Sequence, residues 1–257
     1  MKLAAISYDS EEILKYFAER HKIEYPLLGD PDCKIIDSYG VLNKEATGMQ
    51  KGFARPGYFF IDGKGIIREK FFDARYRERL TGNSLLAKLF PELGQEVTET
   101  VEAPHLQLAL EQSDATGVPG TRITLAVEVR LPPDVHVYAP GTKGYKPIKL
   151  VLEPIPQLQL QPVVYPSSKT LYLAAIKEAV PVFEGAIRIS QDIQVATGAE
   201  FWGSLGNEGK SFTITGKLEY QACDKTTCFV PTSVPVKWQL RLFPLDRTRA
   251  PVEIRHK

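Results

Sequence analysis

Cysteine, methionine and long apolar runs are all scarce in this chain. Its 257 residues include three cysteines and two methionines. Three cysteines are too few to build a fold on disulfides alone. No apolar run approaches the roughly 20 residues that a membrane-spanning helix needs, so we expect no membrane insertion. The opening residues MKLAAISYDS also lack the basic segment, apolar stretch and cleavage site of a signal peptide.

Neither the net charge nor the spacing of possible metal ligands indicates a binding function. The chain has 32 Lys and Arg against 31 Asp and Glu, a net charge of +1, which gives no field to attract nucleic acid. The cysteines and the four histidines do not alternate at zinc-site spacing. We therefore expect no metal, no cofactor and no nucleic-acid partner. The 43% hydrophobic content is enough for one large or two ordinary domains.

Residues 1–92 have the pattern of an α/β domain. A strand at 2–8 precedes a helix that begins near Ser10, where acidic residues follow in the first turn. A second helix carries Cys33 and ends at a glycine. Residues 57–72 predict a β-hairpin around a DGKG turn, and a last helical run follows.

Three segments of this half resemble peroxiredoxin-type (AhpC/TSA-like) thioredoxin-fold proteins over about residues 1–90: AISYDSEEILKYFAERH, YPLLGDPDCKIIDSYGV and RPGYFFIDGKGIIREKFF. The resemblance implies that Pro56, flanked by Arg55, matches a proline that is commonly cis and lines the redox site. The family's reactive cysteine precedes the segment matching Lys2–Tyr8. We therefore expect a truncated thioredoxin-like half, as in a chain that starts internally, that is not a peroxidase by itself; a degenerate, non-catalytic module is the alternative.

Cys33 has two interpretations. A helix amino-terminus can lower the pKa of a thiol, which would make this residue a candidate peroxidase cysteine. A lone cysteine with no cysteine or histidine adjacent in sequence is more often a small packing residue. We favour the packing interpretation.

Beyond residue 92 the pattern changes. Residues 93–103 are acidic and without clear periodicity, which predicts a linker. Residues 104–245 are rich in short β-type runs between Gly, Pro and Asn turns, with one candidate helical turn near 173–177, which favours a sandwich; residues 246–257 are a predicted tail. The predicted strands are 106–110, 122–131, 148–153, 186–193, 211–222 and 234–242.

The segment LEYQACDKTTCFVP contains the other two cysteines. Alternating apolar and polar residues before Cys223 and β-type residues after Cys228 predict a hairpin whose turn is Asp224–Thr227. The two cysteines would then face each other at the base of the loop, within disulfide distance. This geometry suits either a static staple or reversible chemistry. Closing so small a ring contributes only about 2 kcal/mol of unfolded-state entropy.

A second resemblance covers about residues 100–243. The segments VHVYAPG, PIKLVLEP, PVVYPSSK, VPVFEGAIRI and KLEYQACDKTTCFVPTSVPV are similar to the N-terminal immunoglobulin-like domain of thiol:disulfide interchange protein DsbD. The resemblance implies a bacterial, extracytoplasmic domain whose cysteines pass a disulfide between thioredoxin-like proteins. Cys228 would form the mixed disulfide with the partner, and Cys223 would resolve it.

The same resemblance implies a surrounding site. A cap loop at 167–179, containing Leu171, Tyr172 and Leu173, would shield the cysteines. An aromatic pair on an early strand would line the site, and these positions hold His136 and Tyr138. The histidine departs from the family's aromatic pattern.

Two functions follow from these patterns. The leading hypothesis is a thiol:disulfide oxidoreductase that acts through Cys223 and Cys228 on a thioredoxin-like partner, coupled in the full-length protein to a peroxiredoxin-type antioxidant reaction. The alternative is a non-catalytic protein-binding module in which the disulfide is structural. The reduction potential separates them, because a structural disulfide resists reduction by the glutathione pool.

Overall fold

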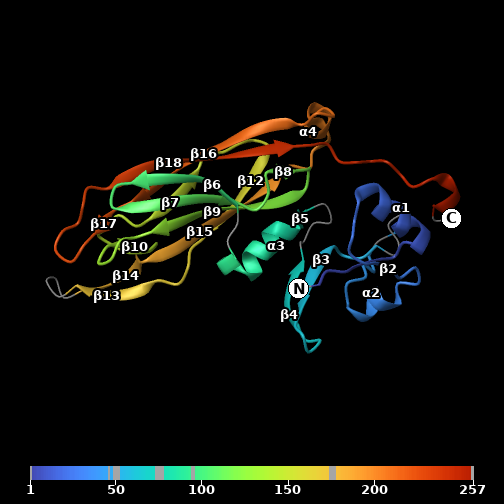
Figure 1. The fold of residues 1–257 in the computed structure, drawn as a ribbon, viewed down its shortest axis with the longest axis horizontal. Helices are drawn as coiled ribbons and strands as arrows, with labels where there is room; N and C mark the ends of the chain where they lie inside the picture. The colour runs from blue at the N-terminus through green and yellow to red at the C-terminus, as the bar shows by residue number, and fades with distance from the viewer. Residues whose placement is uncertain are drawn as a thin grey trace. The chain divides into compact units, whose positions relative to one another are not determined.

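The computed structural model describes residues 2–45, 47–48, 53–72, 78–93, 96–173 and 178–255. The chain forms two compact units, one of Met1–Arg79 with Asp246–Lys257 and one of Leu80–Leu245. The first mixes helices and strands, and the second is built almost wholly of strands (Figure 1). The predicted class, an α/β part followed by an all-β sandwich, is confirmed.

The first unit follows the predicted order of elements through the hairpin. Strand β1 pairs in parallel with β2, and β3 pairs antiparallel with β4. The bounds are β1 (Ala5–Ser7), α1 (Glu11–His21), β2 (Leu27–Gly29), α2 (Lys34–Ser38), β3 (Gly57–Ile61) and β4 (Ile67–Phe72).

Side-chain capping explains where α1 begins. The Oγ of Ser10 accepts a hydrogen bond from the backbone N of Ile13 at 3.4 Å, which satisfies one of the free N–H groups of the first turn. The chain beyond residue 245 returns to this helix, because Nη2 of Arg20 donates to Oδ2 of Asp246 at 2.8 Å. Hydrogen bonds from Thr248 and Arg20 hold the pKa of Asp246 well below its usual range. At least the start of the predicted tail is therefore bound to α1.

The prediction of a cis bond before Pro56 is wrong. No cis peptide bond occurs among the residues that the structure describes, so the Arg55–Pro56 bond is trans. Arg55 is held in an extended loop pairing, because its backbone N donates to the carbonyl of Val41 at 2.7 Å and Ala54 bridges Leu42. The chain then runs directly into β3, and the trans form is the intrinsically favoured one. That Pro56 and Arg55 line a redox site stays a prediction.

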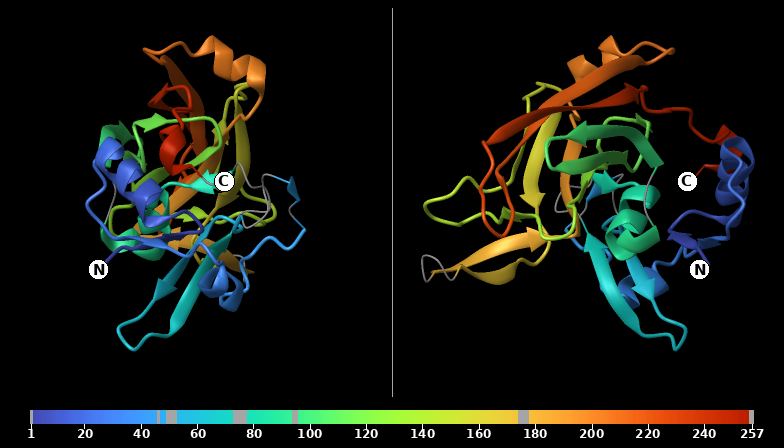
Figure 2. Two further views of the ribbon diagram at one scale, coloured as in Figure 1. Left: turned by 90° about the vertical axis from the view of Figure 1, so that its right-hand side faces the viewer. Right: turned by 60° about the vertical axis from the view of Figure 1, so that its left-hand side comes forward.

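The described residues of the second unit form three sheets (Figures 1 and 2). Their orders are β12-β15-β9-β7-β6 (with β5 on β9), β11-β16-β18-β8 and β13-β14-β10-β17. The bounds are β5 (Arg79–Leu80), β6 (Glu96–Ala103), β7 (Leu106–Gln112), β8 (Thr116–Gly117), β9 (Thr121–Arg130), β10 (His136–Tyr138), β11 (Lys149–Leu152), β12 (Leu158–Val164), β13 (Lys169–Leu173), β14 (Glu178–Glu184), β15 (Ala186–Val195), β16 (Lys210–Tyr220), β17 (Ala222–Cys223) and β18 (Thr232–Leu242).

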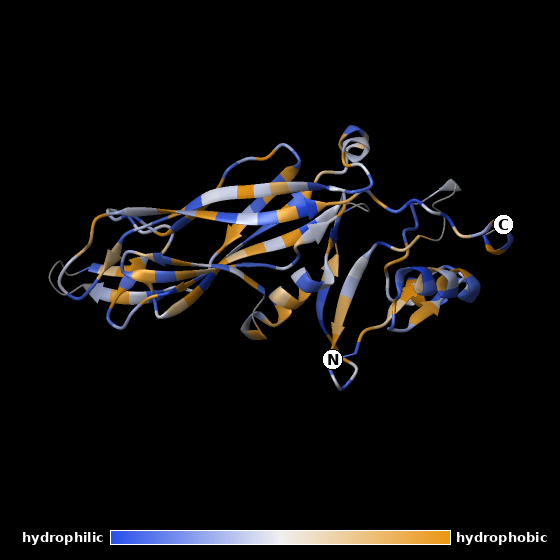
Figure 3. Ribbon diagram, turned by 45° about the horizontal axis from the view of Figure 1, so that its top comes forward, coloured by the Kyte–Doolittle hydropathy of each residue, from blue (hydrophilic) through white to orange (hydrophobic). Residues whose placement is uncertain are grey.

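One hydrophobic core joins these sheets. Strand β18 alternates strictly, with Trp238 and its apolar neighbours at every second position buried and the polar residues between them exposed. Figure 3 shows the alternation as changing colours along the strands. The indole N of Trp238 donates to the carbonyl of Glu111 at 2.9 Å. Gly216 lets β11 approach β16, because a Cβ there would lie 2.5 Å from the carbonyl O of Val151.

Two segments differ from the expectation. Most of the predicted 93–103 linker is strand β6, which pairs antiparallel with β7; its alternating side chains are short of apolar residues because it is an edge strand. Helix α3 (Gly82–Leu89) was expected in the first half but lies against β9 (Figure 2). There the buried Oγ of Ser84 accepts from the backbone N of Thr124 at 3.1 Å. The predicted domain boundaries stay a prediction.

Short helices were also missed. The sequence predicts no helix at three places where the structure has one. These are α4 (Ala199–Ser204), η2 (Pro91–Leu93) and η3 (Val252–Ile254). Single turns such as these carry too little periodicity to be recognised. Within the described part of the chain, no helix has the length and apolarity to cross a membrane.

The core of the second unit can be tested with one substitution at two places. Val129 on β9 is fully buried, whereas Val164 on β12 is 58% exposed. Val129→Ala is expected to lower the free energy of unfolding by about 2 kcal/mol, because it removes buried methyl groups and leaves a cavity. Val164→Ala should change it by less than about 0.5 kcal/mol. Urea denaturation measures both, and equal effects would contradict the placement of the core.

Candidate functional site

The two cysteines lie at the base of a closed hairpin, as predicted. Cys223 and Cys228 form an isolated antiparallel bridge and a disulfide bond, with Cα atoms 4.0 Å apart. The backbone N of Asp224 donates to the carbonyl of Thr227 at 2.9 Å, and the N of Phe229 donates to the carbonyl of Ala222 at 2.9 Å. Backbone hydrogen bonds on both sides of the bridge therefore hold the two cysteines together.

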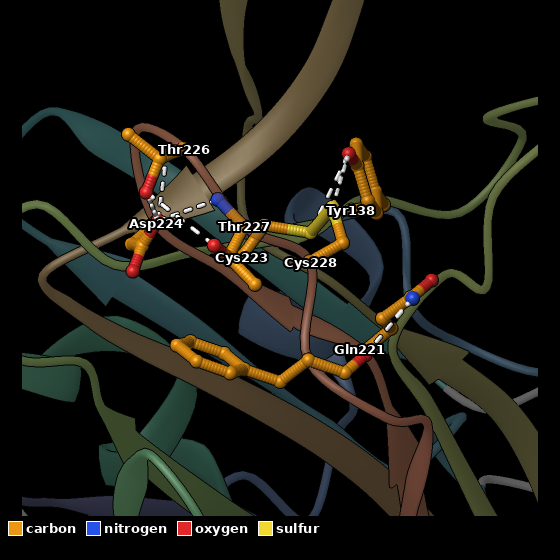
Figure 4. The surroundings of a disulfide bond; sticks show 8 residues. Tyr138, Gln221, Cys223, Asp224, Thr226, Thr227 and Cys228 are labelled. Carbon is orange, nitrogen blue, oxygen red and sulfur yellow. Dashed lines mark hydrogen bonds between the residues drawn. A yellow bond between two sulfur atoms is a disulfide. The ribbon is translucent and has the colours of Figure 1, made fainter.

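Asp224 organises the turn. Its Oδ1 accepts from the backbone N of Thr226 and of Thr227, each at 2.7 Å, and from the Thr226 hydroxyl at 3.0 Å (Figure 4). The N–H groups of Thr226 and Thr227 lower the pKa of this carboxyl group. Lys225 forms an ion pair with Asp134 at 2.7 Å. Both charges beside the disulfide are thus engaged locally, which the sequence did not reveal.

The far side of the hairpin is anchored to the sandwich. Phe229 packs against the main core and stacks on His105, with ring centroids 3.6 Å apart. The side-chain amide of Gln221 donates to the carbonyl of Phe229 at 3.0 Å (Figure 4). The loop that carries Cys228 is therefore fastened on the side away from the turn.

Strand β10 connects the disulfide to the core. Val137, opposite Ala222, faces the main core. The residues on either side of it, His136 and Tyr138, therefore project from the other face of the strand, away from that core. His136 lies opposite Cys223 on one neighbouring strand and opposite Glu184 on the other. Tyr138 lies two residues further along the same face.

The outward face forms a second, smaller apolar cluster around one sulfur. It consists of Tyr138, Val180, Val182 and Cys223, with Tyr145 and Leu171 packed against them. The Tyr138 hydroxyl lies 3.4 Å from Sγ of Cys228 and 3.5 Å from Sγ of Cys223 (Figure 4). Disulfide sulfurs carry no proton, so the hydroxyl is the donor. Burial raises the pKa of Tyr138, which keeps that proton in place.

The residues predicted to line the site do not all lie near the disulfide. Tyr138 contacts both sulfurs, and the ring of His136 packs edge-to-face on it with centroids 5.6 Å apart. Leu171 belongs to the small cluster, but Tyr172 lies on the opposite face of β13 and is 62% exposed. The side chain of Leu173 and residues 174–177 lie outside the described residues. That 167–179 caps the cysteines stays a prediction.

Two neighbours of the site were missed. The ring of Tyr145 stacks on Tyr138 with centroids 4.2 Å apart, yet it comes from the loop GTKGYKP, where no periodicity marks a buried side chain. Glu184 lies opposite His136 through the β10–β14 register. The sequence shows both strands only as short runs, so their pairing was not predictable from it.

The two cysteines differ in exposure. Cys223 is 1% exposed, in the small cluster, whereas Cys228 is an exposed residue. An incoming thiolate must approach a disulfide along the line of the bond to be broken. The arrangement therefore presents Cys228, and not Cys223, to a partner.

Cys33 is not in a reactive setting. It is the N-cap of α2 with φ 56° and makes no side-chain capping hydrogen bond. Partial burial, with Asp30 and Asp32 nearby, raises the pKa of its thiol, which lowers the fraction present as thiolate. In the described part of the chain, no three or more His, Cys, Asp or Glu side chains are grouped as metal ligands.

Comparisons with known proteins divide the chain as the fold does. Residues 1–70 match the AhpC/TSA family. Residues 107–238, just over half of the chain, match the family described as thiol:disulfide interchange protein DsbD, N-terminal. The comparison with curated proteins gives no match.

Solved structures give weaker likenesses. The N-terminal periplasmic domain of ScsB from Proteus mirabilis shares 12% identity at a TM-score of 0.40, over 56% of this chain and 51% of that one. The reduced N-terminal domain of DsbD from Neisseria meningitidis shares 13% at a TM-score of 0.31, over 44% of this chain and 74% of that one. The chain thus spans about half the length of the ScsB structure.

The Asp224 turn can be tested through the stability of the disulfide. Asp224→Ala removes the acceptor of three hydrogen bonds, so the reduced hairpin should hold its two thiols near each other for less of the time. The disulfide then forms less readily, and its reduction potential should become less negative. Equilibration with glutathione buffers measures it. Because the pKa of Asp224 is lowered, the wild-type turn should persist to below about pH 4 and loosen only as the carboxylate is protonated.

The control for this experiment is Asp134→Asn. It removes the ion-pair partner of Lys225 without touching the hydrogen bonds of the turn. Asparagine also tolerates the left-handed conformation of residue 134 (φ 65°). A potential that moves equally in both variants would mean that net charge, and not the turn, governs the disulfide.

Proposed function

Because the chain belongs to the family of the N-terminal part of thiol:disulfide interchange protein DsbD, we propose that it exchanges its Cys223–Cys228 disulfide with thioredoxin-like proteins. The observation that carries the proposal is the unequal exposure of the two cysteines. A disulfide that serves only as a staple needs no exposed half, whereas an exchanging one must present a sulfur to its partner and keep the other in reserve.

The residues divide the exchange into two steps. A partner thiolate attacks Sγ of Cys228, the Cys223–Cys228 bond breaks, and its electron pair leaves on Sγ of Cys223. The Tyr138 hydroxyl, within 3.5 Å of both sulfurs, stabilises the thiolate by donating a hydrogen bond to it. In the second step another thiolate of the partner attacks the partner sulfur, the bond from that sulfur to Cys228 breaks, and its electron pair leaves on Sγ of Cys228. In the reverse direction the Cys223 thiolate attacks Sγ of Cys228 in the mixed disulfide, and the partner thiolate leaves.

The match of residues 1–70 to the AhpC/TSA family supports a further part of the proposal. The exchange would serve a peroxiredoxin-type antioxidant reaction of the full-length protein. Cys33 is a poor candidate for the peroxide-reactive cysteine because the pKa of its thiol is raised.

The proposed compartment is extracytoplasmic. Stable disulfides persist mainly in oxidising surroundings such as the bacterial periplasm, and the Cys223–Cys228 bond is formed in the structure. In such a compartment the pair would cycle only when a specific partner engages Cys228.

Trapping with serine variants tests the order of the two cysteines. Cys223→Ser leaves the exposed Cys228 thiol and should accumulate a mixed disulfide with a thioredoxin-like protein, seen on non-reducing gels. Cys228→Ser leaves only the buried thiol of the pair and should trap little or none through it. Cys33→Ser should leave exchange between the wild-type pair and the partner unchanged. Equal trapping by the two hairpin variants would contradict the assignment.

The hydroxyl of Tyr138 is tested with a matched pair of variants. Tyr138→Phe should slow disulfide exchange at neutral pH by about threefold to tenfold, because a hydrogen bond to a charged atom contributes about 1 kcal/mol or more. Tyr145→Phe removes the same atom from the ring that stacks on Tyr138, and it leaves in place the Tyr138 hydroxyl that lies within 3.5 Å of both sulfurs. Stopped-flow kinetics should show a normal rate for Tyr145→Phe, and equal slowing in both variants would refute the role of Tyr138.

A further inference from the structure

Strand register places four reactive side chains in one row across the small sheet. Glu184 on β14 lies opposite His136 on β10, His136 lies opposite Cys223 on β17, and Cys223 lies opposite Cys228. Directly opposite residues of antiparallel strands project from the same face, with Cβ atoms about 4.5–5.5 Å apart. The row is thus carboxylate, imidazole, sulfur, sulfur.

One nitrogen of the imidazole in this row has no hydrogen-bond partner among the residues that the structure describes. His136 is 5% exposed, and its Nε2 is buried with no donor or acceptor within reach. An unpaired buried polar atom destabilises the folded state and calls for an explanation. In the disulfide state the neighbouring sulfurs carry no proton. Reduction gives Cys223 a thiol proton, which is what an unpartnered imidazole nitrogen can accept.

We propose that His136 accepts the proton of the Cys223 thiol when Cys223 attacks Cys228 and the disulfide forms again. Glu184 then faces the imidazolium that results. The proposal rests on the exchange function proposed above and adds the group that activates the resolving cysteine. Packing alone accounts for the edge-to-face contact with Tyr138 but not for a buried, unpaired nitrogen on a residue that lies directly opposite Cys223 in the strand register.

The step balances in atoms and electrons. In the mixed disulfide, Cys228 is bonded to the partner sulfur and Cys223 is a thiol. The imidazole nitrogen of His136 takes the thiol proton, and the Cys223 thiolate attacks Sγ of Cys228. The Cys223–Cys228 bond forms, the bond from Cys228 to the partner breaks, and its electron pair leaves on the partner sulfur. The partner thiolate then takes a proton from the imidazolium or from water.

The charges around His136 suit an acceptor that is neutral at rest. Burial lowers the pKa of His136, and the opposing effects of Glu184 and Asp224 are smaller, so the imidazole carries no charge at neutral pH. The other groups facing it are Cys223 on β17 and Tyr138 on its own strand. Glu184 also pairs with Lys169 of β13 at 3.4 Å.

The first test measures the thiol itself, without any partner. In the full chain carrying Cys33→Ser and Cys228→Ser, Cys223 is the one remaining thiol, and the ultraviolet absorbance of its thiolate is followed against pH. Adding His136→Phe, which keeps an aromatic ring against Tyr138, is expected to raise the pKa of Cys223 by about one unit, a tenfold loss of thiolate. An unchanged titration would overturn the proposal. His105→Asn, a histidine beside the same hairpin but outside the row, is the control and should leave the titration unchanged.

The second test follows the closing step. The reduced chain carrying Cys33→Ser is mixed with a small aromatic disulfide, and release of the second aromatic thiolate reports attack by Cys223 on Cys228. His136→Phe should slow this release about tenfold or more at pH 7. The deficit should vanish above the ordinary thiol pKa of about 8.5, where solvent removes the proton. A deficit equal at every pH would indicate packing alone and overturn the proposal, as would no deficit.

Glu184→Gln should give a smaller deficit with the same dependence on pH, and a wild-type rate would remove Glu184 from the proposal. Because the probe is a small disulfide, these results do not depend on a protein partner. Failure of the wild-type chain to exchange with thioredoxin-like proteins would overturn the proposed function while leaving the titration of Cys223 to decide the role of His136.

Discussion

The pairing of β10 with β17 is the contact on which the site depends. Through Val137 and Ala222 it ties a two-residue strand into the main core, and through His136 and Cys223 it sets the side chains that surround the disulfide. One short strand thus has a structural face and a chemical face. Because the core side is fully buried, the outer side chains are placed with little freedom.

The disulfide is held in an unsymmetrical environment. On one side Cys223 is part of a small apolar cluster, and on the other Cys228 belongs to an exposed turn whose backbone is braced by Asp224. Tyr138 bridges the two environments, since its ring lies in the cluster and its hydroxyl reaches both sulfurs. The same bond therefore has a protected end and an accessible end, and burial rather than charge distinguishes them.

Much of this could be predicted from the sequence because the signals were local. The alternation along β18 and the residues around Cys223 and Cys228 specify strands and a turn without reference to the rest of the chain. What failed was non-local. The edge strand β6 has few apolar residues, α3 gave no sign of which unit it packs on, and Tyr145 comes from a loop. The position of each of these elements depends on contacts with residues that are distant in the sequence.

Strand register has a consequence for how this sequence can vary. In β10 the side chains alternate between core and site with a period of two, so a one-residue shift of this strand along β17 would turn Val137 toward the sulfurs and the rings of His136 and Tyr138 into the core. A single substitution along β10 changes one side chain, whereas a shift of its register against β17 changes the surroundings of all three. Insertions and deletions should therefore be confined to the loops on either side of this strand.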